Sequence, residues 1–134
     1  METARVRWVD HLQFLGVAPS GHAVPLDADR QANTAPGPME LLLVALGGCT
    51  ATDVVEILRK KRQPLVGLEV EVSGSRAEQP PRVWQRIEVV YRLRGALDEQ
   101  AVRSAIELSL SKYCSVSQML GKTAEITHRY VLEP

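Results

Sequence analysis

The feature that most limits how this chain can fold is a long apolar segment in its first half. Pro38 suits the first turn of a helix, where its missing N–H costs nothing, and the next proline along the chain is Pro64. Basic side chains at residues 59–62 complement the negative end of a helix. We therefore predict one helix over residues 38–62. Residues 41–46 are apolar all round and should be buried on every side, which a single chain struggles to provide, so the pattern predicts a dimer.

On either side of this helix, apolar and polar residues alternate in the way that predicts strands. The expected strands are residues 4–9, 12–17, 22–26, 68–72, 83–93 and 123–132, with a loop at residues 27–37. Because the strands are grouped and do not alternate singly with helices, we expect an α+β fold in a single domain over residues 1–134.

Two shorter helices are expected in the second half of the chain. Asp98 is placed to cap the first of them. The tetrad Ser115-Val116-Ser117-Gln118 has the pattern of a capping box and predicts a short helix that ends at Gly121. The inward side of the Asp98-capped helix should carry Val102, Ala105, Ile106, Ser109, Leu110 and Tyr113.

Charge and hydropathy exclude several classes of function. Sixteen Lys and Arg residues balance sixteen Asp and Glu residues, whereas a nucleic-acid binder needs an excess of positive charge. The longest apolar run, residues 41–46, is far shorter than the roughly 20 residues that span a membrane, and residues 1–5 do not lead into an apolar signal segment. We expect a cytoplasmic protein that binds neither nucleic acid nor membrane.

The two cysteines are the candidates for chemistry. In a cytoplasmic protein a cysteine is either a buried apolar side chain or a redox group, because structural disulfides belong to secreted proteins. Cys49 falls in the middle of the long helix, directly after Gly47-Gly48, and Asp53 lies one turn further along the same face. An ionised Asp53 there would disfavour a thiolate at Cys49. Cys114 should precede a helix N-terminus, where the helix dipole favours a thiolate.

Other chemistries find less support in the sequence. Asp53 and Glu56 share a helix face and are either an acid–base pair or solvated carboxylates. His11, His22 and His128 lack the spacing of zinc ligands, and there is no nucleotide-binding or hydrolase motif. We expect no metal and no cofactor, and from the residues alone both interpretations of the cysteines stay open.

The cysteine segments and the start of the long helix resemble those of the OsmC/Ohr superfamily, and more narrowly the YhfA-like branch of OsmC-type proteins. The likeness extends over nearly the whole chain, and the two cysteine motifs, with their order and wide separation, are its specific part. The segments concerned are Pro38-Met39-Glu40-Leu41-Leu42-Leu43, Gly47-Gly48-Cys49-Thr50-Ala51 and Lys112-Tyr113-Cys114-Ser115-Val116.

The resemblance implies antiparallel sheets wrapped around long central helices in an intertwined homodimer. It also implies a thiol peroxidase that acts in oxidative-stress defence on organic hydroperoxides. On the family pattern Cys49 matches the peroxidatic cysteine and Cys114 the resolving cysteine, and an external dithiol reduces the disulfide that they form. The alternative is a dimer of the same fold that binds a small apolar ligand, or is merely structural, without peroxidase turnover.

The chain departs from the peroxidase branches of this family at one place. Those branches carry a glutamate directly after the helix-opening proline, paired with an arginine from an N-terminal loop. Here Met39 takes that position and the glutamate is Glu40, which a rotation of about 100° per helical residue should turn to another side. Arg7 and Arg30 are the arginines in plausible reach.

Overall fold

The computed structural model describes all 134 residues, and the chain divides into two compact units, residues 1–42 and residues 43–134. The boundary falls inside the long helix α1 (Pro38–Lys60), whose first turn belongs to the first unit. Each unit has its own three-stranded sheet. The α+β class expected from the grouping of strands is confirmed.

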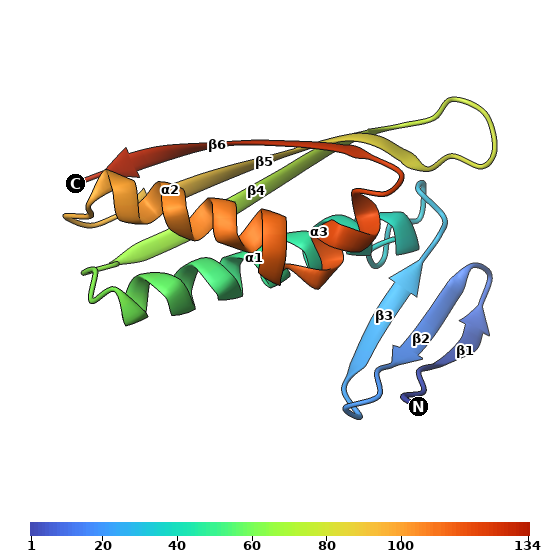
Figure 1. Ribbon diagram of the computed structural model, residues 1–134. Helices are drawn as coiled ribbons and strands as arrows, with labels where there is room; N and C mark the ends of the chain where they lie inside the picture. The colour runs from blue at the N-terminus through green and yellow to red at the C-terminus, as the bar shows by residue number, and fades with distance from the viewer. The chain divides into compact units, whose positions relative to one another are not determined.

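The first unit is a meander of three antiparallel strands, β1 (Arg5–Asp10), β2 (Gln13–Val17) and β3 (Ala23–Asp27), paired in that order (Figure 1). His11 makes the tight turn between β1 and β2 at a positive φ of 46°. All of β1 is exposed, including Trp8 at 65%. The strands fall where the alternation predicted them, but in this unit the sheet leaves large apolar side chains uncovered.

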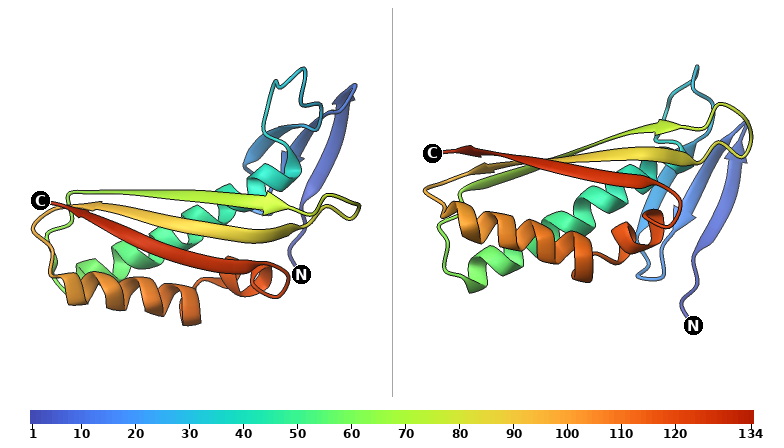
Figure 2. Two further views of the ribbon diagram at one scale, coloured as in Figure 1. Left: turned by 90° about the horizontal axis from the view of Figure 1, so that it is seen from above. Right: turned by 45° about the horizontal axis from the view of Figure 1, so that its top comes forward.

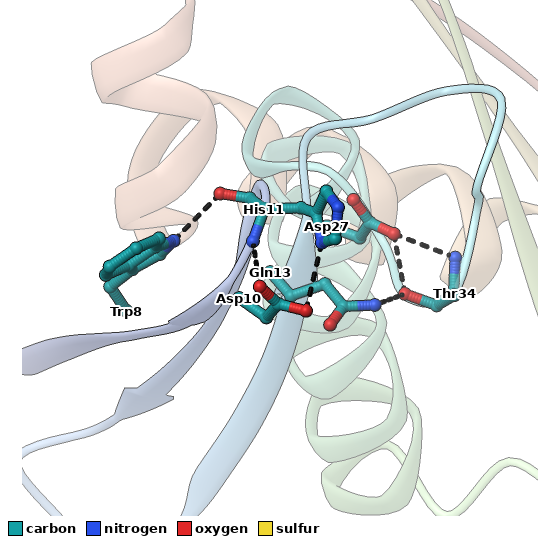
Figure 3. A network of polar contacts seen from close by, with 6 residues as sticks. All are labelled: Trp8, Asp10, His11, Gln13, Asp27 and Thr34. Atoms are coloured by element: carbon teal, nitrogen blue, oxygen red, sulfur yellow. Dashed lines mark hydrogen bonds and ion pairs between the residues drawn. The ribbon is translucent and has the colours of Figure 1, made fainter.

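Asp27 organises the loop that follows β3, as Figure 3 shows. Its carboxylate accepts hydrogen bonds from the Thr34 hydroxyl at 2.6 Å and from the Thr34 N–H at 3.0 Å, and also from the Asp29 N–H at 2.8 Å. These hydrogen bonds, led by that from the Thr34 hydroxyl, hold the pKa of Asp27 below its usual range. Gln13 donates to the Thr34 hydroxyl oxygen at 3.0 Å, which fastens the loop to β2.

The second unit is a sheet of β4 (Gly67–Arg76), β5 (Trp84–Arg94) and β6 (Glu125–Glu133) with helices on one face (Figures 1 and 2). β4 and β5 are antiparallel, whereas β5 and β6 are parallel. A parallel pair needs a long crossover, and here the crossover contains α2 (Glu99–Leu108), the π-helix η1 (Ser109–Tyr113) and α3 (Ser115–Leu120). Asp98 caps α2 as expected, since its carboxylate accepts from the Ala101 N–H at 3.2 Å.

The core of the second unit lies between the middle strand and two helices. Alternate residues of β5 point inward and are fully buried, as the period of two predicts. In α1 the buried residues recur every fourth position, which makes one stripe along the helix. The residues on these inward faces are Ile87, Val89, Tyr91 and Leu93 of β5, Leu46, Thr50, Val54 and Leu58 of α1, and Ala101, Val102, Ala105 and Ile106 of α2.

Leu46 in the first half of α1 is covered, but Val44 is 66% exposed in the single chain. Burial of this half on every side was expected only with a second subunit, so that expectation stays a prediction. A second expectation about burial is wrong. Tyr113 is 51% exposed and does not join the inward side of α2, because the chain leaves α-helical geometry at Ser109. By length and composition alone α1 is also apolar enough to cross a membrane, a property that it shares with core helices of soluble proteins.

Candidate functional site

Cys49 lies in the middle of α1, in the second unit, with a partly exposed free thiol. The two glycines before it sit inside a helix, where each costs about 1 kcal/mol relative to alanine. Gly47 has a packing reason: a Cβ there would come within 3.3 Å of the Val72 side chain on β4. The absence of a side chain at Gly47 therefore allows β4 to pack closely against the turn of α1 that leads to Cys49.

Cys114 is fully buried and is the N-cap residue of α3. Its backbone is extended, with φ −75° and ψ 99°, and its Sγ accepts a hydrogen bond from the Ser117 N–H at 3.4 Å. The predicted capping box is therefore wrong in its register, because the cap is Cys114 and not Ser115. The position ahead of a helix N-terminus is confirmed.

The structure brings the two cysteines together, although they are far apart in the sequence. Both are free thiols, and Cys49 lies near enough to interact with the Cys114 side chain. Burial is the main cause that raises the pKa of the Cys114 thiol above its ordinary value, and the neighbouring Cys49 raises it further. The Ser117 backbone and side chain lower it in part. At neutral pH the buried sulfur is thus held as a thiol.

A chain of buried hydroxyl groups lies beside this pair, and no motif in the sequence predicts it. Thr50, the residue after Cys49, is fully buried. Its Oγ1 lies 2.7 Å from the Tyr91 Oη and 2.7 Å from the Ser109 Oγ. Ser109 in turn donates to the Asp53 carboxylate at 2.8 Å. The one available signal was a threonine in the middle of an otherwise apolar helical stripe.

Asp53 thus reaches the site through Ser109. It is half-buried and lines a pocket of about 510 Å³ together with Glu56, Lys60 and Tyr113, among others. Burial raises the pKa of Tyr91, which lies at the other end of this series of hydroxyl groups, to about 12, and the nearby Cys114 and Asp53 add to that rise.

The remaining candidates from the sequence lie elsewhere. No group of three or more His, Cys, Asp or Glu residues is placed to hold a metal ion. His22 hydrogen-bonds Ser20 at 2.9 Å, and His11 pairs with Asp10 at 3.0 Å. Arg30 and Glu40 form an ion pair in the first unit, so the one-residue displacement of the glutamate does not prevent it from pairing with an arginine.

An apolar groove runs along the open side of α1 within the second unit. It has a volume of about 430 Å³ and lies between one face of the helix and the inner side of β4. Both glycines before Cys49 line it. The lining residues are Leu43, Val44, Gly47, Gly48, Ala51, Leu68, Val70 and Val72.

Comparison with known proteins agrees with this architecture. The family model described as OsmC-like protein matches residues 31–129. Protein YhfA of Escherichia coli strain K12 is 46% identical over 128 residues, which cover 95% of this chain and 95% of YhfA.

Two solved structures share the fold at low sequence identity. The OsmC-like protein from Mycoplasma pneumoniae has a TM-score of 0.87 at 18% identity and covers 100% of this chain and 98% of its own. The organic hydroperoxide resistance protein OhrB of Bacillus subtilis has a TM-score of 0.71 at 12% identity, over 96% of this chain and 98% of its own. The range that the family model matches includes both cysteine segments. The chain therefore belongs to the OsmC-like protein family and is a YhfA-like member of it.

Proposed function

We propose that this protein is a thiol-dependent hydroperoxide reductase, with Cys49 as the peroxidatic and Cys114 as the resolving cysteine. The observation that carries the proposal is the meeting of two free thiols from separate elements, one partly exposed and the other fully buried. A cysteine pair that serves only as apolar filling has no need to meet. The OsmC-like family, whose structural relatives include an organic hydroperoxide resistance protein, agrees with a redox role.

The chemistry follows from the two positions. The Cys49 thiolate attacks the outer oxygen of a hydroperoxide, an S–O bond forms, the O–O bond breaks, and the alkoxide leaves and takes up a proton as an alcohol. Cys49 is then a sulfenic acid. The Cys114 sulfur attacks it, an S–S bond forms, the S–O bond breaks, and the hydroxyl leaves as water with the proton that Cys114 gave up. An external dithiol supplies two electrons and restores both thiols.

The different exposure of the two sulfurs suits this division of work. Cys49 is partly exposed and Cys114 is fully buried, so a hydroperoxide in solution should reach Cys49 more readily. The raised pKa of Cys114 keeps it protonated, and a thiol is a poor nucleophile. Peroxide should therefore oxidise Cys49 first and leave Cys114 reduced until it condenses with the sulfenic acid. No metal or cofactor enters these steps.

We further propose that the working form is a cytoplasmic homodimer. The apolar groove along α1 and β4 is open, and Val44 at its edge is 66% exposed. In the first unit, Val6, Trp8 and Val9 of β1 are each more than 60% exposed. Patches of this kind on a soluble protein mark surfaces that a partner covers. A second copy of the chain is the partner that is always present.

The direct test of the proposed function is peroxide consumption coupled to a dithiol. Cumene hydroperoxide with dithiothreitol should be turned over by the unmodified protein and not by Cys49→Ser. In Cys114→Ser the sulfenic acid at Cys49 has no partner, so dimedone should label Cys49 after one equivalent of peroxide. Mass spectrometry that finds neither a dimedone adduct in this variant nor a Cys49–Cys114 disulfide in the unmodified protein would overturn the proposal and favour the ligand-binding alternative.

A further inference from the structure

Ser109 is joined to both cysteine segments at once. Its side chain hydrogen-bonds Thr50 at 2.7 Å, and Thr50 directly follows Cys49 in α1. Its backbone carbonyl accepts a hydrogen bond from the Cys114 N–H at 2.7 Å. Ser109 is itself fully buried. One residue thus holds the helix turn that carries one sulfur and the backbone that carries the other.

The hydroxyl chain has only one consistent direction. Ser109 has a single hydroxyl proton and donates it to Asp53, so the Thr50 hydroxyl must donate to Ser109. The proton of Thr50 is then used, so Tyr91 must donate to Thr50. The chain therefore runs from Tyr91 through Thr50 and Ser109 to the Asp53 carboxylate. Its last hydrogen bond is charge-assisted, and those are the strong ones. Asp53 therefore anchors the orientation of every hydroxyl before it.

The π-helix that begins at Ser109 connects the backbone of this residue to the backbone of Cys114. The Cys114 N–H reaches back five residues to the Ser109 carbonyl, whereas an α-helix would use the carbonyl four residues back. The wider turn places Cys114 in the core and Tyr113 at the surface. Single π turns are frequent at functional sites. Here the turn ends at the buried sulfur.

We propose that Ser109 is a positioning residue that sets the separation of the Cys49 and Cys114 sulfurs, with Asp53 and Thr50 holding it in place. This inference rests on the proposed function for its biological meaning. The inference can also be tested without a hydroperoxide, because the distance between two thiols determines how readily any oxidant joins them in a disulfide. The reaction to be measured is exchange with oxidised glutathione: two thiols of the protein become one disulfide, and one glutathione disulfide becomes two glutathione thiols.

The test is the effective concentration of the two thiols in glutathione redox buffers, read as the ratio of disulfide to dithiol after acid quenching and mass spectrometry. Because a displacement of about 1 Å in reacting groups can cost about 100-fold, we expect Ser109→Ala to lower the effective concentration by about tenfold or more. Ser111→Ala is the matched control. It removes a hydroxyl from the same π-helix, but that hydroxyl is exposed and bonds only the Glu107 carbonyl, so the effective concentration should not change.

A second pair of variants covers the case in which Ser109→Ala does not fold. Asp53→Ala removes the acceptor that orients Ser109 and should lower the effective concentration in the same direction. Asp53→Asn keeps an acceptor oxygen and should restore it. Folded Ser109→Ala or Asp53→Ala protein with the unmodified effective concentration would overturn the assignment, as would an unmodified protein that forms no Cys49–Cys114 disulfide with glutathione. If that disulfide forms normally while hydroperoxide is not consumed, the peroxidase proposal fails and the role of Ser109 stands.

Discussion

The sulfur of Cys114 caps the helix that follows it: its Sγ lies 3.4 Å from the Ser117 backbone nitrogen and accepts that N–H. The first N–H groups of a helix have no partner within the helix, and a thiol is a weak acceptor compared with the oxygens that usually serve. The atom proposed to resolve the sulfenic acid therefore also holds the start of α3. Any change at Cys114 affects both chemistry and local stability, and the two effects can be separated by the choice of substitution.

Cys114→Ser should keep the cap, because serine is among the best N-cap residues, whereas Cys114→Ala should lose it. We expect the serine variant to be more stable than the alanine variant by about 1 kcal/mol, as measured by urea unfolding. Ser115→Ala is the control, since Ser115 is exposed and does not cap α3 in this structure. If Ser115→Ala proves as costly as Cys114→Ala, the capping-box register expected from the sequence is correct after all.

The raised pKa of Cys114 predicts a pH dependence for disulfide formation. Burial raises this pKa above the ordinary thiol value of 9.0, so the reactive thiolate becomes more abundant as pH rises through and beyond that value. After oxidation of Cys49 by one equivalent of hydroperoxide, the rate of disulfide closure should still be increasing with pH at 9.0. Quenched-flow trapping with an alkylating agent measures it. A rate that levels off well below this pH would mean that a cation or a hydrogen bond stabilises the Cys114 thiolate.

The order of strands and helices could be read from the sequence because it depends on local patterns. Alternation in residues 83–93 matches the buried face of β5, and Asp98 caps α2 as its type and position predicted. Both cysteines were identified from their motifs. That they lie beside each other did not follow from composition or periodicity and came only from the family resemblance.

The errors arose where tertiary packing overrides local pattern. Nothing in Ser109-Leu110-Ser111-Lys112-Tyr113 indicates a π turn, so helical periodicity placed Tyr113 in the core when it is 51% exposed. The hydroxyl chain through Thr50 was missed for a related reason, since its members come from three separate elements, α1, β5 and η1. A buried polar residue is a signal, but its partners can be found only in space.

The apolar groove on α1 predicts which substitution should separate the proposed dimer without harm to the fold. Val44 is 66% exposed in the single chain, so Val44→Asp should cost the monomer little. In a dimer that buries the groove, the same aspartate would be an unpaired buried charge. We expect Val44→Asp to give a folded monomer in light scattering at micromolar concentration, while the unmodified protein is a dimer.

Val66→Asp is the matched control for this substitution, because Val66 is 67% exposed and does not line the groove. It should leave the oligomeric state unchanged. Leu46→Asp is a poor test, since Leu46 is fully buried within one chain and its loss would unfold the monomer itself. Dimers of normal stability with Val44→Asp would place the contact between copies elsewhere.

Tyr91 predicts a loss of stability in strong alkali. Its pKa is raised from 10.0 to about 12, chiefly by burial, so the folded protein holds the phenol proton more tightly than the unfolded chain does. The contribution is fully present below pH 10.0 and is lost as the pH rises toward about 12. It amounts to about 2–3 kcal/mol at most. Tyr91→Phe removes the ionisation together with one hydrogen bond, which itself is worth about 1 kcal/mol.

Below pH 10.0 the Tyr91→Phe variant should therefore be slightly less stable than the unmodified protein, and the difference should shrink or reverse as the pH approaches 12. Urea unfolding at a series of pH values measures this. The difference in stability between Tyr91→Phe and the unmodified protein cancels the titration of all other groups, because both proteins share them. Tyr113→Phe, at a half-exposed position, should follow the unmodified protein throughout. If Tyr91→Phe and the unmodified protein lose stability in parallel across this range, the Tyr91 hydroxyl ionises as freely in the folded state as in water, and the hydroxyl chain that ends at Asp53 is open to solvent.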